Sequence, residues 1–128
     1  AVSKAKSHTP AISGVISRAA CNAANELKAA AIVSSTKSGA TARRISQCRP
    51  ECPIVAVTPS EKVAKSLAFC FGVYPVVAED QNSTDAMMAN ATKIAVENGF
   101  ANSGDTVVIA AGLDQVGSTN LLKVSVVE

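Results

Sequence analysis

The sequence predicts a three-layer α/β/α fold around a five-stranded, mostly parallel sheet whose last strand is antiparallel and lies at the edge. Short apolar runs alternate with longer segments of helical periodicity along the 128-residue chain. The links between these segments are short, which is typical of a parallel sheet with helices on both faces. The last run follows the fourth strand through a loop of about ten residues, too short for the usual crossover helix.

The first helix is predicted over residues 10–28. Thr9 supplies a hydroxyl cap directly before Pro10, a residue that suits the first helical position. Apolar residues then recur at the spacing of an amphipathic helix. They are Ile12, Val15, Ile16, Ala19, Ala23 and Leu27.

The remaining elements are bounded by proline, glycine and capping residues. Pro50 closes the second helix, and Gly72 and Gly99 close the third and fourth. The stretch 58–61, Thr-Pro-Ser-Glu, has the spacing of a capping box, so the third helix is predicted to start there and to continue through Phe71. Strands are predicted over 30–34, 54–57, 73–78, 106–110 and 121–127, and helices over 40–49 and 82–98.

The composition excludes several function classes. Twelve Lys and Arg against 10 Asp and Glu give a net charge of +2, and only 3% of residues are aromatic, which argues against nucleic acid and membrane surfaces as partners. The sequence has no run of eighteen apolar residues and no signal peptide, so we expect a cytoplasmic protein. One domain over 8–128 is predicted, preceded at 1–7 by a linker or the cut end of another domain.

Four cysteines occur without the spacing of a zinc site. We predict free thiols that are buried or half-buried, because an unpaired cysteine behaves as a small apolar residue. They are Cys21, Cys48, Cys52 and Cys70.

A polar turn, SSTKSGATARR at residues 34–44, directly follows the first predicted strand. Ligands of parallel sheets gather beyond the carboxyl ends of strands, and the first amides of a helix favour an anion. Three hydroxyls can donate hydrogen bonds, a lysine adds charge, and a glycine lets the backbone come close. The residues alone leave two interpretations open, a phosphate cradle or an ordinary turn and cap. The candidate residues are Thr36, Lys37, Ser38, Gly39 and Thr41.

The sequence brings no nucleophile, base and orienting group together, and it predicts neither a catalytic nor a metal site. His8 is interpreted as a solvated linker residue, Asp85 as a first-turn helix acid and Asp105 as a turn acid. For Arg43 and Arg44, assistance to an anion and a solvated helix face both remain open.

An ordered series of motifs resembles the carboxy-terminal domain of pyruvate kinase, over residues 8–127. The order of the motifs makes the resemblance more specific than any one of them. They are TKSGATAR at 36–43, RP at 49–50, PIVAVT at 53–58, GVYPV at 72–76, STD at 83–85, GDTVV at 104–108, Gly112, and TN at 119–120.

The resemblance implies a regulatory and oligomerisation domain of an enzyme that transfers the phosphoryl group of phosphoenolpyruvate to ADP. In this family the catalytic residues and the magnesium and potassium sites lie in a barrel domain and lid, so no cofactor is expected in this chain. The resemblance also implies a tetramer interface and a sugar-phosphate effector site, built from the 36–41 loop and a later loop. The residues of that later loop are Gly112, Asp114, Gly117, Ser118 and Thr119.

The later loop departs from family members that are activated by fructose bisphosphate. It has no cationic side chain, and Asp114 would repel a second phosphate. A monophosphate such as glucose 6-phosphate is therefore favoured over fructose 1,6-bisphosphate. Two alternatives stay open: a free-standing phosphate-binding module, and a small enzyme of flavodoxin-like topology, against which the missing catalytic constellation counts.

The last strand, 121–127, is expected to place Leu122, Val124 and Val126 on the core and Leu121 on the outer face. An edge strand with unpaired backbone groups needs a cover. Because the resemblance implies a two-fold contact between carboxy-terminal domains, this strand and the first helix are predicted to lie at that contact.

Overall fold

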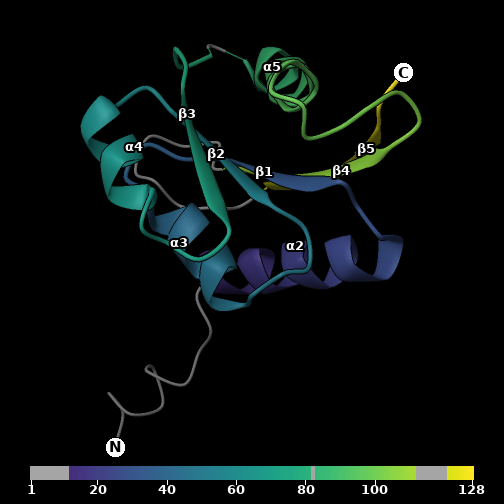
Figure 1. Ribbon diagram of the computed structural model, residues 1–128, viewed down its shortest axis with the longest axis horizontal. Helices are drawn as coiled ribbons and strands as arrows, with labels where there is room; N and C mark the ends of the chain where they lie inside the picture. The colour runs from purple at the N-terminus through teal and green to yellow at the C-terminus, as the bar shows by residue number, and fades with distance from the viewer. Residues whose placement is uncertain (1–11, 82, 112–120) are drawn as a thin grey trace, which may run out of the picture.

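The structure, a computed structural model, describes residues 12–81, 83–111 and 121–128. Five strands form one sheet in the order β3-β2-β1-β4-β5, with helices on both faces (Figure 1). All neighbouring strands are parallel except β4 and β5, so the predicted fold class and the antiparallel edge strand are confirmed. The elements are α2 (Ile12–Leu27), β1 (Ala31–Ser35), α3 (Ala40–Gln47), β2 (Ile54–Thr58), α4 (Glu61–Leu67), β3 (Val73–Val77), α5 (Thr84–Glu97), β4 (Thr106–Ala111) and β5 (Leu121–Val126).

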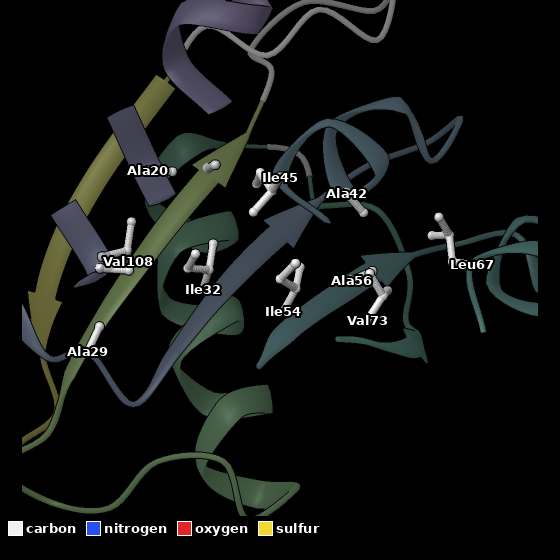
Figure 2. Packing of buried hydrophobic residues seen from close by; sticks show 12 residues of the cluster. Ala20, Ala29, Ile32, Ala42, Ile45, Ile54, Ala56, Leu67, Val73 and Val108 are labelled. Carbon is white, nitrogen blue, oxygen red and sulfur yellow. The ribbon is translucent and has the colours of Figure 1, made fainter. Parts of the chain in front are cut away.

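The core has one cluster on each face of the sheet. Ile32 and Ile54 belong to the cluster beneath α2, α3 and α4, which Figure 2 shows from close by. Val33 and Val55, their neighbours in sequence, belong to the opposite cluster beneath α5. Buried β-branched residues on both faces are typical of a parallel sheet covered by helices, and they explain why these strands appear in the sequence as unbroken apolar runs.

Helix α2 packs on the sheet through small side chains rather than through its larger apolar ones. Ala20 and Ala24 are buried, whereas Ile12, Val15 and Leu27 are 68%, 43% and 50% exposed. The helix is confirmed from Ile12 onward, but these three members of the predicted apolar series do not pack in the core. Small side chains let the helix approach the sheet closely, so larger apolar residues can remain on its outer side.

The start and end of α4 differ from the prediction. Its cap is Ser60, whose hydroxyl accepts a hydrogen bond from the Val63 amide at 3.2 Å, while Thr58 is the last residue of β2. The helix ends at Leu67, and Phe71 follows it in a turn with its ring centroid 4.4 Å from the guanidinium carbon of Arg49. A serine directly before Glu61 caps better than a threonine that is already hydrogen-bonded within a strand.

The prediction for the faces of β5 is also corrected. Leu122 packs on the α2 side as expected, but Val124 and Val126 are 45% and 60% exposed, and Leu121 packs against the α5 cluster instead of facing outward. The reason is the edge position of β5, because α2 packs chiefly on the neighbouring strand β4 and leaves part of β5 uncovered.

Other local predictions are confirmed. All four cysteines are free, with Cys21 buried and the others half-buried. Asp85 lies in the first turn of α5, and the carboxylate of Asp105 accepts a hydrogen bond from the Asn102 amide at 2.8 Å in the turn before β4. Among the described residues, no helix has both the length and the apolar character needed to cross a membrane.

Candidate anion-binding site

The carboxyl ends of β1 and β4 lie side by side at the point where the order of the strands in the sheet changes direction. From β1 the chain passes through α3 to β2, which is the neighbour of β1 on one side, whereas β4 is its neighbour on the other side. Ser35 and Ala111, the last residues of the two strands, are paired in the sheet. Open α/β sheets bind ligands at such a switch point. The residues predicted in the later loop, Gly112, Asp114, Gly117, Ser118 and Thr119, lie outside the described residues.

The 36–41 segment forms a tight turn that leads into α3. Thr36 is buried, and its hydroxyl oxygen accepts a hydrogen bond from the Gly39 amide at 2.9 Å. The hydroxyl oxygen of exposed Ser38 accepts one from the Ala40 amide at 3.3 Å. Thr41 is buried in the first turn of α3. Of the three predicted hydroxyl donors, Ser38 is therefore the exposed one, while Thr36 holds the shape of the turn.

Both the backbone conformation at position 39 and the atoms around it favour glycine there. It caps α3 with φ of 91°, a left-handed conformation that disfavours every residue with a Cβ. A Cβ at this position would also lie 2.7 Å from an Arg43 guanidinium nitrogen and 3.3 Å from a methyl group of Leu67. The turn thus brings side chains of α3 and α4 directly against its backbone.

Arg43 brings positive charge to this turn. Its guanidinium donates hydrogen bonds to the Ser38 carbonyl at 3.2 Å and to the Ser66 hydroxyl of α4 at 2.8 Å. The sequence left the role of Arg43 open, and its position four residues after Gly39 is the signal that places it over the turn. Arg44 instead lines a hollow between α2 and α3 together with Arg18.

Lys37 pairs with an acid that the sequence did not single out. Its ammonium lies 3.1 Å from a carboxylate oxygen of Asp80, which follows β3, and both side chains are about half exposed. An exposed pair of this kind is worth less than about 1 kcal/mol. Lys37 is therefore available to an anion, although Asp80 places a negative charge beside it.

Ser34, which precedes this turn in β1, has an unusual environment. It is completely buried between Ala56 of β2 and Ala110 of β4. Among the described residues, its hydroxyl is the one buried side-chain polar group without a hydrogen-bond partner. Such a group lowers stability, because it loses its hydrogen bonds to water without replacing them.

The comparisons with known proteins agree on one family. Residues 15–125 match the family described as "Pyruvate kinase, alpha/beta domain". The pyruvate kinase of Clostridium acetobutylicum is 48% identical over 118 residues, which cover 91% of this chain and 25% of that relative. The pyruvate kinases of Staphylococcus epidermidis (strain ATCC 12228) and Staphylococcus aureus (strain COL) are 48% and 46% identical over 103 residues, covering 79% of this chain and 18% of each relative. The chain thus spans a quarter or less of the length of these relatives.

Proposed function

The chain belongs to the family of the pyruvate kinase alpha/beta domain, and from this premise we propose that it is the regulatory and oligomerisation domain of a pyruvate kinase. The parent enzyme would transfer the phosphoryl group of phosphoenolpyruvate to ADP in the cytoplasm. Its barrel domain would precede residues 8–128 and hold magnesium and potassium. Within the described residues, no group of three or more His, Cys, Asp or Glu side chains could hold a metal ion.

The proposed effector site is the turn at 36–41, and the observation that carries it is the convergence of anion-binding groups at the switch point. The start of α3 favours negative charge because the positive end of its helix dipole lies there. The Ser38 hydroxyl oxygen already accepts from Ala40, which leaves its hydrogen to donate to a phosphate. Lys37, which lies in the turn, and Arg43, whose guanidinium donates to the Ser38 carbonyl, add positive charge.

We propose a sugar monophosphate such as glucose 6-phosphate as the effector. The preference over fructose 1,6-bisphosphate rests on Asp114, the acid in the later loop, and on the absence of a cation there. Asp80 adds a further negative charge next to Lys37. A second phosphate would lose hydration without gaining an arginine partner.

Calorimetric titration with glucose 6-phosphate, fructose 1,6-bisphosphate and inorganic phosphate tests this site. Ser38→Ala should lower the affinity for the monophosphate at least tenfold, since one hydrogen bond to a charged group is worth about 1.5–3 kcal/mol. Ser103→Ala is the matched control, because Ser103 lies in the turn before β4, at the amino ends of the parallel strands and so at the opposite end from the 36–41 turn. Equal affinity of the parent chain and Ser38→Ala would refute the site. A hundredfold preference for the bisphosphate would refute the effector class.

The proposed contact between two copies uses the outer side of α2 and the edge strand β5. Val124 pairs with Val108, a member of the α2-side cluster, so it lies on the same face of the sheet as α2. Val124 and Val126 are exposed there, as are Ile12 and Val15 of the helix. A two-fold contact would cover these residues and the unpaired backbone of β5, and it would close the assembly.

Light scattering tests this contact. Val124→Glu should weaken self-association, because it places a charge in the proposed apolar interface. Val96→Glu is the control, since Val96 is similarly exposed, at 41% against 45%, but lies on α5 across the sheet. Leu121 is unsuitable for this test because it packs against the α5-side cluster. A monomeric parent chain, or a Val124→Glu variant that associates equally well, would contradict the proposal.

A further inference from the structure

Three cysteines gather where α2, the end of α3 and the segment before β2 meet. Cys21 lies on α2 and is 3% exposed, while Cys48 follows directly after α3 and Cys52 lies just before β2. The Cys21 thiol donates a weak hydrogen bond to the Cys48 carbonyl, with the sulfur 3.6 Å from the oxygen. Neither Cys21 nor Cys48 takes part in the proposed effector site or in the proposed contact between copies.

The segment 48–52 is fixed against α2 by further contacts. The Asn25 side-chain nitrogen Nδ2 donates to the Cys21 sulfur at 3.9 Å, and the Asn25 side-chain oxygen Oδ1 accepts from the Glu51 backbone amide at 3.0 Å. Lys28 forms an ion pair with Glu51 at 3.9 Å. Cys21 and Asn25 lie one turn apart on the same side of α2, and Lys28 directly follows the helix, so this part of the chain contacts both Cys48 and Glu51.

Cys48 is the nearer partner of Cys21. Burial raises the pKa of the Cys21 thiol, and Cys48 raises it further through its charge and through a hydrogen bond between the two side chains. Burial also raises the pKa of Cys52, but Cys21 acts on that thiol through charge alone. The 3.6 Å contact between the Cys21 sulfur and the Cys48 carbonyl oxygen places these two cysteines next to each other.

Cys48 is also within reach of a small reagent. It is half-buried and lines a hollow of about 360 Å³ between α2 and α3. Arg18 and Arg44, which line the same hollow, give it a positive charge. A small molecule with negative charge would be attracted to this position.

We propose that Cys21 and Cys48 are a redox modification site, at which a small anionic disulfide such as oxidised glutathione converts the two thiols into a reversible disulfide. Two cysteines in contact on different elements, one of them lining a positively charged hollow, support this assignment. The inference rests on these contacts and does not depend on the proposed effector site.

The reaction consists of two thiol–disulfide exchanges. The Cys48 thiolate attacks one sulfur of oxidised glutathione, breaks its S–S bond, and releases one glutathione thiolate. The Cys21 thiol then loses its proton and attacks the Cys48 sulfur of the mixed disulfide, which releases the second glutathione. Two protein thiols are oxidised, one glutathione disulfide is reduced, and the two protons end on the two glutathione thiols.

The experiment incubates the chain in mixtures of reduced and oxidised glutathione and measures its intact mass and a non-reducing peptide map. The parent chain should lose two hydrogens and show one cross-link, between Cys21 and Cys48. Its thermal midpoint should rise by on the order of 10 °C, and dithiothreitol should reverse the rise.

Cys48→Ser should form no internal disulfide, whereas the control Cys70→Ser should behave as the parent chain does. Four results would overturn the proposal: an unchanged parent mass, a stable mixed disulfide at Cys48, a cross-link that includes Cys52 or Cys70, or a disulfide in Cys48→Ser. The peptide map of the parent chain decides the matter even where a variant does not fold.

Discussion

Replacing Gly39 with alanine tests whether the turn before α3 is as tightly packed as the structure indicates. The new Cβ would lie 2.7 Å from an Arg43 nitrogen and 3.3 Å from a Leu67 methyl group, at a backbone φ of 91°. Arg43 can move away, but it then loses its hydrogen bonds to the Ser38 carbonyl and the Ser66 hydroxyl. Leu67 is fully buried and has little room to move.

The cost of this change has two parts. The left-handed backbone conformation disfavours alanine by about 1–2 kcal/mol. Displacing Arg43, which is partly exposed and so makes weakened hydrogen bonds, and crowding Leu67 add about 1–2 kcal/mol. We therefore expect Gly39→Ala to lower the free energy of unfolding by about 2–4 kcal/mol in total.

Gly104→Ala is a close control, because Gly104 has φ of 90° and no atom within 4 Å of the position of its missing Cβ. Urea unfolding should show only the backbone part of the cost there, about 1–2 kcal/mol. In an Arg43→Ala background, the cost of Gly39→Ala should fall toward that of Gly104→Ala. The reasoning is refuted if Gly39→Ala and Gly104→Ala destabilise the chain equally.

Four further predictions concern single side chains. Ser34→Ala should raise the free energy of unfolding by about 1 kcal/mol in urea titrations, because it removes a buried hydroxyl without a partner; Ser46→Ala, which breaks a 2.7 Å bond to the Phe71 carbonyl, should lower it by a similar amount. Asp80→Asn should tighten inorganic phosphate binding about threefold in calorimetry, because Lys37 loses its competing acid. Burial raises the pKa of Cys21, so the native state holds the thiol proton more tightly than the unfolded state does. The free energy of unfolding should therefore fall as pH rises above the ordinary thiol pKa of 9.0. The fall should be smaller in Cys21→Ala.

The sequence predicts the elements of this fold well, because the strands contain short apolar runs and most helices carry local start and stop residues. Ser83, for example, caps α5 by accepting a hydrogen bond from the Ala86 amide at 3.1 Å. The sequence does not predict which side of α2 packs against the sheet. Ile12 and Val15 have the same apolar character whether they face the core or the outside, and only the position of the sheet distinguishes the two.

For the candidate site too, the sequence predicted the local features but not the contacts between distant residues. The turn, its glycine and its place after β1 follow from local pattern and from the position of ligands in parallel sheets. Asp80 beside Lys37 and Ser66 beside Arg43 were not predicted. Each of these contacts joins residues far apart in the sequence, so no local spacing could signal it.

Helix α3 relates the two proposed sites to each other. Gly39 caps its start, at the candidate effector turn, and Cys48 caps its end, next to Cys21. The helix has 8 residues and includes Ile45, which is fully buried, so it is held by the core between its two ends. A disulfide at its carboxyl end would tie it to α2, the helix of the proposed contact between copies, and would make no contact with the turn at its start. Oxidation should therefore act on the contact through α2 more directly than on the affinity for a phosphate.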